Sequence, residues 1–331
     1  MGWVMKAIRF DRYGSPDVLE IRDVAIPAVG DDELLVRVRA ASVNPLDWHF
    51  MRGMPYAVRL MAGLSRPKAS ARKLGADMAG SVEAVGKSVT SFSPGDQVFG
   101  GLEERGTLAE YITIRADRAV LAKPASLTFE QAAAVPVAGF TALQALRDKG
   151  RIQPGYKVLV NGASGGVGTF AVQLAKALGG EVTGVCSSQN VATVAALGAD
   201  RVIDYTREDF TKSERQYDLL LDIAGSRSPS QTRRVLLPTG VLVGVGGPDK
   251  GNWVGPLSRA ARMTLMSLAV SQRMVFFIAQ QNKADLTVLH EFIDSGKIVP
   301  VVDRTYPFAQ AADAIRYLEE GHARGKVVVT I

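Results

Sequence analysis

The sequence predicts an α/β protein in which a doubly wound parallel sheet is joined to a second, β-rich region. Residues 157–245 alternate apolar runs of strand length with runs of helical spacing, which is the pattern of a parallel sheet covered by helices. Residues 6–114 instead show short alternating runs separated by turns, as in an all-β region. With 331 residues and 47% hydrophobic content, the chain is long enough for two domains with ordinary cores.

The stretch from residue 157 to residue 176, KVLVNGASGGVGTFAVQLAK, is the most informative in the chain. A buried strand is expected at 158–160 and a helix with an apolar stripe at 172–178, and glycines fill the turn between them. Glycine allows a tight turn and a close approach to a pyrophosphate, which the N–H groups at the start of the helix would face. A glycine pattern alone is a weak motif, but between a strand and a helix it predicts a dinucleotide site. The glycines are Gly162, Gly165, Gly166 and Gly168.

The residues after this turn extend the same unit. A helix is expected at 192–197, and further strands at 181–186, 201–205, 217–223 and 240–245. Each strand ends in small or polar residues, and ligands of doubly wound sheets bind at these carboxyl ends. Glycines that merely terminate strands would explain any single end, but several such ends beside the glycine turn favour a cofactor groove.

The end of the second strand indicates which dinucleotide is bound. A carboxylate there would bind a ribose 2′-OH and repel a 2′-phosphate, but residues 186–190 contain none. Ser187, Ser188, Asn190 and Tyr205 are able to donate hydrogen bonds to a 2′-phosphate, although residues 187–194 include no Lys or Arg. NADPH is therefore the expected cofactor, with NADH as the alternative.

The β-rich region is expected to take up both ends of the chain. Its strands are predicted at 6–10, 18–24, 33–43, 80–85, 97–99 and 111–114. After the nucleotide unit, a helix at 286–296, a strand at 299–305, a helix at 309–320 and a final strand at 326–331 are expected, the last returning to the N-terminal sheet. The predicted domains are 1–124, completed by 284–331, and 125–283, with the active site between them.

Cysteine content and the first residues bear on the cellular compartment. The single cysteine, Cys186, rules out an intramolecular disulfide and a multi-cysteine zinc site, and it fits a reducing cytoplasm. It falls on a strand covered on both faces, so we interpret it as a core residue and not as a nucleophile. Residues 1–6 lack the charged and apolar regions of a secretory signal, and a cytoplasmic location is expected.

Neither a membrane nor a nucleic acid is an expected partner. The most apolar stretch, 263–279, is interrupted by Ser, Gln and Arg, so a buried strand and helix are predicted there in place of a membrane span. The net charge of +6 suits anionic ligands, but the basic residues are dispersed. Nucleic-acid binding would need a continuous basic face. The one basic cluster consists of Arg66, Lys68, Arg72 and Lys73.

Several sequence blocks, in this order, match one known family. They are SVNPLD at 42–47, LGADMAG at 74–80, SPGDQV at 93–98, VPVAGFTA at 135–142, the glycine turn at 162–168, VIDY at 202–205 and GHARGK at 321–326. On these blocks the chain resembles the medium-chain dehydrogenase/reductase superfamily, and within it the zinc-free quinone oxidoreductase (zeta-crystallin-like) branch. The resemblance implies a GroES-like β-rich domain, a Rossmann-type second domain and a homodimer.

The zinc-dependent members of that superfamily hold their catalytic metal with Cys and His. The matching positions here are Asp47, or a near neighbour, and Asp77, and the three histidines at 49, 290 and 322 lie far apart in the sequence. No zinc is therefore expected. Without a Lewis acid, a quinone or an α,β-unsaturated carbonyl is a better substrate than an unactivated alcohol, because charge delocalises onto its oxygen.

The resemblance places Asn44 near the nicotinamide or the substrate and Thr141 against the nicotinamide, and Asp47 is the third candidate catalytic residue, as a member of a proton network. Each has an alternative: Asn44 as a turn former, Asp47 as a mere partner for a nearby base, and Thr141 as a hydroxyl at a helix N-terminus. No residue is assigned as the proton donor, because water is able to protonate a reduced product.

The predicted cofactor contacts come from the glycine turn, the strand ends and the C-terminal block. For the charged residues of that block, Arg324 and Lys326, the alternative is a solvated surface position. The predicted contacts are Ser164, Gly165, Gly166, Val167, Ser187, Ser188, Asn190, Tyr205, Ala224, Gly244, Gly246, Arg324, Gly325 and Lys326.

Two other functions remain open: a zinc-free carbonyl or alcohol dehydrogenase of the same fold, and a non-catalytic NADPH-binding protein.

Overall fold

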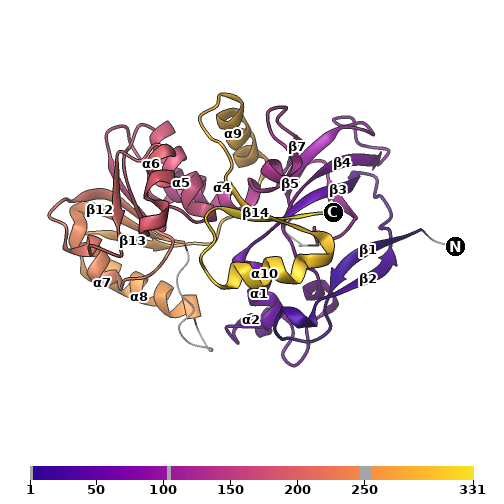
Figure 1. Ribbon diagram of the computed structural model, residues 1–331, viewed down its shortest axis with the longest axis horizontal. Coiled ribbons are helices and arrows are strands. Elements are labelled where there is room, and N and C mark those ends of the chain that lie inside the picture. The colour runs from indigo at the N-terminus through magenta and orange to yellow at the C-terminus, as the bar shows by residue number, and fades with distance from the viewer. Residues whose placement is uncertain (1–2, 103–105, 246–254) are drawn as a thin grey trace. The chain divides into compact units, whose positions relative to one another are not determined.

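The chain divides into two compact units. The computed structural model describes residues 3–102, 106–245 and 255–331 (Figure 1). Unit 1 comprises residues 1–137, 281–294 and 300–331, and unit 2 comprises residues 138–280 and 295–299. The first boundary thus falls at 137/138, and not at 124/125 as the sequence suggested, because residues 125–137 pack with the β-rich unit.

Unit 1 is built on a mixed sheet and a hairpin. In the part of the chain that is described, the sheet runs β14 (Val302–Pro307), β15 (Lys326–Thr330), β3 (Glu33–Val43), β4 (Asp77–Val85), β5 (Gln97–Gly101) and β7 (Val120–Ala122), with β6 (Tyr111–Arg115) paired to β3. The hairpin is β1 (Val4–Arg9) and β2 (Glu20–Ala25). The predicted return of the last strand is confirmed, because β15 pairs antiparallel with β3.

Helices interrupt the region that the sequence suggested to be all β. They are α1 (Pro45–Arg52) and α2 (Val58–Ala62), while α3 (Phe129–Ala133), α9 (Lys283–Asp294) and α10 (Ala311–Glu319) follow later in the chain. The all-β expectation was wrong at residues 45–52 because this segment has a helix-start pattern: Asn44 at the N-cap, Pro45 in the first turn and Asp47 at N3.

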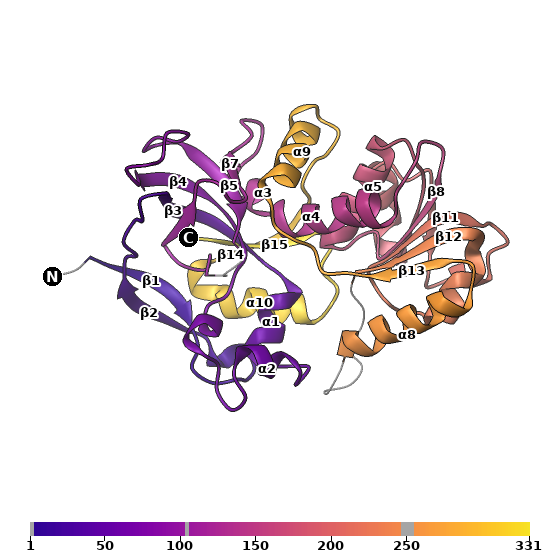
Figure 2. The same ribbon diagram turned by 180° about the vertical axis from the view of Figure 1, so that it is seen from behind.

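Unit 2 contains the predicted doubly wound sheet, which is confirmed. Its described strands all pair in parallel, in the order β10 (Arg201–Asp204), β9 (Glu181–Cys186), β8 (Lys157–Asn161), β11 (Tyr217–Asp222), β12 (Leu236–Gly244) and β13 (Arg273–Phe276). Helices lie on both faces of this sheet (Figure 2). They include α4 (Pro136–Gln144), which starts in unit 1, α5 (Gly166–Ala177), α6 (Val191–Ala196), α7 (Pro229–Thr232) and α8 (Gly255–Ala269).

Each unit has its own core. In unit 2, Val158, Leu159 and Val160 are fully buried, as expected for a parallel strand covered on both faces. In unit 1, strand β3 alternates buried and exposed side chains near Arg37 and Arg39 and is buried toward Val43, where it approaches the site described below.

The expectation that residues 263–279 are buried was only partly correct. This segment forms the end of α8 and strand β13, but Leu265, Leu268 and Ile278 are 68%, 84% and 83% exposed. Of the polar residues that argued against a membrane span, Gln272 is buried and Ser267 Oγ accepts a hydrogen bond from the Met274 N–H, whereas Ser271 is exposed. No described helix has the length and apolar character needed to cross a membrane.

The single cysteine lies in the core of unit 2. Cys186 ends strand β9 and is 2% exposed, and burial, together with the nearby Asp204 carboxylate, raises the pKa of its thiol to about 11. The interpretation of Cys186 as a core residue is confirmed, since a protonated, buried thiol is a poor nucleophile.

We predict that Cys186 reacts with a thiol reagent only when the protein unfolds. At pH 8, the native protein should release almost no chromophore from Ellman's reagent, whereas denaturant should expose about one equivalent of thiol. Fast reaction of the native protein would contradict the burial described here. A Cys186→Ala variant is the control, and it should react in neither state.

Candidate active-site residues

A buried carboxylate organises the candidate site in unit 1. Asp77, at the start of β4, is fully buried, and its Oδ2 accepts hydrogen bonds from Ser42 Oγ (2.6 Å), Asn44 Nδ2 (2.9 Å) and Lys326 Nζ (3.1 Å). Its Oδ1 accepts a fourth from the Val137 N–H (2.8 Å). We call these five residues the Asp77 cluster.

The register of three neighbouring strands explains why these residues meet. Ser42 lies opposite Asp77 in the antiparallel pair β3·β4, and Val43 lies opposite Val327 in the pair β3·β15. Asn44 directly follows β3, and Lys326 is the first residue of β15. The end of β3 and the starts of β4 and β15 therefore share one edge of the sheet.

Lys326 carries the positive charge of the cluster. It is 4% exposed, and its Nζ donates to Asn44 Oδ1 (2.6 Å) and to Asp77 Oδ2 (3.1 Å). An ammonium has three N–H donors, so one is left without an acceptor among the described residues. The alternative that Lys326 is a solvated charge was wrong. Arg324 is exposed, and Gly325 is buried beside it; their predicted contacts with a cofactor stay predictions.

Asp47 holds backbone groups and sits next to the cluster. Its Oδ2 accepts from the Asn44 N–H (2.8 Å) and its Oδ1 from the Gly75 N–H (2.7 Å), and the carboxylate is buried. Gly75 has a positive φ of 84°, and a Cβ there would lie 2.2 Å from Thr107 Oγ1. Asp47 thus fixes both Asn44 and the turn before β4, which favours a positioning role over direct chemistry.

Thr141 belongs to unit 2 and lies inside a helix. It is buried in the middle of α4, so the alternative that it is a hydroxyl at a helix N-terminus was wrong. Its predicted place beside the nicotinamide stays a prediction.

The glycine turn of unit 2 forms a cradle at the N-terminus of α5. Gly165 is the N-cap, and Ser164, Gly166 and Val167 are partly exposed beside it. The first turn of the helix contains no acidic side chain, so its N–H groups and dipole favour an anion. The four residues that the motif predicted to contact the cofactor are therefore together.

Two glycines of the turn have different spatial constraints. A Cβ on Gly168 would lie 2.0 Å from the carbonyl oxygen of Gly162, so only glycine allows the helix to pack this closely on the turn. A Cβ on Gly165 would meet nothing closer than that same oxygen at 3.7 Å. Gly168 is therefore needed for the fold, whereas Gly165 keeps space open at the face that the phosphates would occupy. This arrangement fits a dinucleotide.

A second buried carboxylate, which sequence reasoning missed, lies at the ends of the central strands. Asp222 Oδ1 accepts from Asn161 Nδ2 (2.8 Å) and from the Gly225 N–H (2.9 Å), while Oδ2 pairs with the Arg259 guanidinium. Its only signal in the sequence was an Asp at the end of an apolar strand. The Ala224 N–H donates to the Asn161 carbonyl (3.2 Å), so Ala224 lies at this edge of the sheet as predicted.

The two other predicted strand-end glycines have different outcomes. Gly244 ends β12, and a Cβ there would lie 2.9 Å from Met263 Sδ of α8. Helix packing alone is thus enough to require glycine at 244, and its contact with a cofactor stays a prediction. Gly246 lies outside the described residues.

Two of the predicted ribose-binding residues, Ser187 and Asn190, are hydrogen-bonded to each other. Asn190 Nδ2 donates to Ser164 Oγ (3.2 Å) and to Ser187 Oγ (3.1 Å), which links the turn after β9 to the glycine cradle. Ser188 Oγ donates to Asp204 Oδ2 (2.5 Å). Tyr205, next along the chain, is largely exposed.

A carboxylate and a guanidinium from the neighbouring strand reach this turn. Asp204 ends β10, opposite Cys186 in the parallel pair, and the hydrogen bond from Ser188 is the main cause that lowers its pKa below the usual range. Arg207 Nε lies 3.4 Å from Asp204 Oδ2. The sequence argument looked for a carboxylate only at residues 186–190 and for a cation only at residues 187–194, and it therefore missed both charges.

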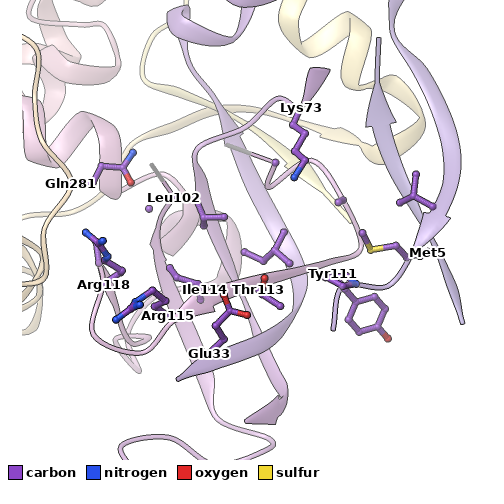
Figure 3. Close-up of a pocket in the computed structure, with 18 of the residues that line it drawn as sticks. Met5, Glu33, Lys73, Leu102, Tyr111, Thr113, Ile114, Arg115, Arg118 and Gln281 are labelled. Atoms are coloured by element: carbon purple, nitrogen blue, oxygen red, sulfur yellow. The ribbon is translucent and has the colours of Figure 1, made fainter. Parts of the chain in front are cut away.

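A separate cavity lies within unit 1. Its volume is about 510 Å³. It is lined by apolar residues such as Met5, Leu102 and Ile114 and by basic residues such as Arg115 and Arg118 (Figure 3). None of the predicted site residues is among those that line it.

We predict that Gly165→Val and Gly168→Val fail in different ways. The Gly165 variant should keep the wild-type melting temperature but weaken NADPH binding about 100-fold or more, because its side chain fills the phosphate face. The Gly168 variant should lose about 3 kcal/mol of stability or more, because its side chain overlaps backbone atoms. Thermal melts and cofactor titration followed by fluorescence distinguish the two, and normal NADPH binding by the Gly165 variant would contradict the cradle.

Comparisons with known proteins agree with this architecture. Residues 30–125 match the alcohol dehydrogenase GroES-like domain family, and residues 197–329 match the zinc-binding dehydrogenase family. The mouse mitochondrial NAD(P)H oxidoreductase RTN4IP1 is 35% identical over 99% of this chain and 89% of its own length. The chloroplastic NADPH-dependent alkenal/one oxidoreductase of Arabidopsis thaliana is 32% identical over 98% and 79%.

Solved structures show the same fold. The quinone oxidoreductase of Coxiella burnetii superposes with a TM-score of 0.86 at 33% identity, covering 99% of this chain and all of that one. The predicted GroES-like and Rossmann-type domains are thereby confirmed. Given full-length relatives above 30% identity and two matched domain families, the chain belongs to the medium-chain dehydrogenase/reductase superfamily.

Proposed function

We propose that this protein is an NADPH-dependent oxidoreductase that reduces a quinone or an α,β-unsaturated carbonyl without a zinc ion. The Asp77 cluster is the observation that carries the proposal. It puts the Asp77 carboxylate where the resemblance expects a metal-binding imidazole, and the Asn44 amide and the Lys326 ammonium already donate hydrogen bonds to that carboxylate.

The donor set does not fit a catalytic zinc. Zinc sites of this kind use three Cys, His or acidic ligands. Asp77 already accepts four hydrogen bonds, both oxygens of Asp47 accept backbone N–H groups, and Cys186 is a buried, protonated thiol of unit 2. Among the described residues, no group of three or more possible ligands comes together. These residues therefore support no zinc-dependent step, although residues 197–329 match a family named zinc-binding dehydrogenase.

The glycine cradle fits NADPH. Ser164, Gly165, Gly166 and Val167 would hold the pyrophosphate at the N-terminus of α5. When bound, the cofactor would supply the hydride. Ser187, which accepts from Asn190, keeps its hydroxyl hydrogen for the adenosine ribose, whereas Ser188 already donates to Asp204; we propose Arg207 as the cation for a 2′-phosphate.

The acceptor class follows from the chemistry that the cluster can provide. The Asn44 amide and the Lys326 ammonium are hydrogen-bond donors, and such groups stabilise negative charge on a carbonyl oxygen. A conjugated acceptor develops its charge on that oxygen when hydride adds. The Arabidopsis relative is named as an alkenal/one oxidoreductase and the Coxiella structure as a quinone oxidoreductase, which supports both substrate types.

Compartment and assembly are less constrained. The mouse and Arabidopsis relatives are named mitochondrial and chloroplastic, so the expected cytoplasmic location stays a prediction. The homodimer implied by the resemblance also stays a prediction.

The test of this function is NADPH oxidation, followed at 340 nm, against a panel of quinones, enals, enones and simple alcohols. We expect turnover with quinones or enones, unchanged by a chelator, with product analysis distinguishing C=C reduction from quinone reduction. Alcohol oxidation without enone or quinone reduction would favour the dehydrogenase alternative. Tight NADPH binding with no NADPH consumption would favour the non-catalytic alternative. Stoichiometric zinc in the purified protein, whose removal abolishes activity, would contradict the zinc-free proposal.

We further predict that Arg207→Gln lowers the preference for NADPH. Removal of an exposed cation beside the 2′-phosphate should raise the Kd of NADPH about fivefold and leave that of NADH within about twofold. Arg201→Gln, at the opposite end of β10, is the matched control and should change neither Kd. Equal effects on both cofactors would refute the assignment of Arg207.

A further inference from the structure

We infer that Lys326 is a catalytic residue whose ammonium stabilises the oxygen anion formed on the acceptor. The inference rests on the proposed function and deepens it, since it replaces the cofactor contact expected for Lys326. It assigns to a lysine at the start of the last strand the electrostatic role that zinc has in other members of the superfamily.

The geometry of Lys326 leaves one donor available. Its Nζ is held by Asn44 Oδ1 at 2.6 Å and by Asp77 Oδ2 at 3.1 Å, and no further acceptor occurs among the described residues. A buried ammonium with an unused N–H gains from an oxygen anion more than a solvated one does, because the local dielectric is low. The acceptor oxygen would complete the set of three hydrogen bonds.

Asp77 acts as the positioning residue. Ser42 and the Val137 N–H hold its carboxylate in place by hydrogen bonds, and the carboxylate in turn holds the Lys326 ammonium in place. Asn44 donates to Asp77 and accepts from Lys326, which closes the hydrogen-bonded ring. This preorganisation lets the donor act without a reorganisation cost when charge develops.

The energetics of burial also point to chemistry. Removing an ion pair from water costs several kcal/mol per ion, and an apolar pair of similar volume is often as stable or more stable. The Lys326–Asp77 ion pair is therefore weak evidence for a purely stabilising role, although Ser42, Asn44 and the Val137 N–H also use Asp77 as their acceptor. Stabilisation of an anion gives the pair a role that apolar residues cannot fill.

The reaction balances with NADPH as the reductant. Hydride adds to the β-carbon of an enone, the C=C π electrons move to form an enolate, and the negative charge rests on the oxygen that Lys326 faces. The enolate then takes a proton at the α-carbon from water, and NADP⁺ remains. Lys326 stays an ammonium throughout, so no proton donor is required within the cluster.

Substrates should differ in their dependence on Lys326. The enolate oxygen is more basic than the oxygen of a hydroquinone anion, so it needs more stabilisation in the transition state. Loss of the ammonium should therefore affect enones more than quinones. A purely structural lysine would affect both substrates equally.

The test compares three variants and a control. Lys326→Met alone leaves a buried carboxylate uncompensated and is expected to be unstable. The double variant Lys326→Met/Asp77→Asn removes both charges, keeps an oxygen that accepts from Ser42 and Asn44, and should fold with a melting temperature slightly below that of the wild type. Lys326→Arg keeps the charge. Lys283→Met is the control, because Lys283 donates to the Ala116 carbonyl and lies over the Phe92 ring, neither of which belongs to the Asp77 cluster.

For the double variant, we expect kcat/KM to fall about 100-fold or more on an enone and about tenfold on a quinone, as for the loss of one oxyanion donor. The Kd of NADPH should change less than about threefold. The control should match the wild type, and Lys326→Arg should recover part of the enone activity.

Three results would overturn the inference. A folded double variant with wild-type kcat/KM on the enone would make the pair structural. A large rise in the Kd of NADPH with unchanged kcat would make Lys326 a cofactor contact. If the wild-type protein consumed NADPH with none of the quinones, enals or enones tested, the proposed function itself would be refuted. This failure is distinguishable from the other two because the wild type alone reveals it, before any variant is made.

Discussion

The proposed chemistry depends on one interaction, the buried contact between the Lys326 ammonium and the Asp77 carboxylate. The two residues are 249 positions apart in the chain, and they meet because β15 and β4 both pair with β3. The last strand of the chain thus completes the N-terminal sheet and delivers the charge at the same time. Asn44, at the N-cap of α1, bonds to both partners and fixes the distance between them.

Unit 2 solves a different problem, the binding of a highly charged cofactor without a dense cationic patch. Its cradle relies on backbone N–H groups at the start of α5 and on hydroxyls and an amide from the turn after β9. The carboxylates near it are already engaged, Asp222 by Arg259 and Asp204 by Ser188 and Arg207. Arg259 thus pairs with the Asp222 charge and Arg207 with the Asp204 charge, so these two carboxylates, which the sequence argument did not weigh, repel phosphates less than unpaired ones would.

Features set by neighbouring residues could be predicted from the sequence, whereas contacts between distant segments could not. Local patterns located β3 and β9 at the residues observed and identified the cradle from its glycines. Helix α1 was missed because its short start signal was interpreted as a turn. Side chains whose partners come from distant segments could be named only by resemblance: Asn44 and Lys326 were expected near the chemistry, but nothing in the spacing brought them to Asp77.

Charges from neighbouring strands show the same limit. Asp204 and Arg207 were not weighed for the ribose turn because strand pairing, and not sequence proximity, brings them there. The prediction for Leu265 and Leu268 was wrong for a different reason: they belong to an apolar run that suggested burial, but helix α8 leaves both side chains exposed. The local sequence was thus enough to predict the core strands and the glycine turn, whereas the charges around the site depend on which strands pair in the fold.

A crystal structure with NADP⁺ and an unreactive conjugated ketone would test the central claim most directly. The account predicts the ketone oxygen at about 3 Å from Lys326 Nζ, with the hydrogen bonds to Asn44 and Asp77 preserved. A phosphate oxygen of the cofactor at Nζ, or a metal ion bound to Asp77, would contradict it.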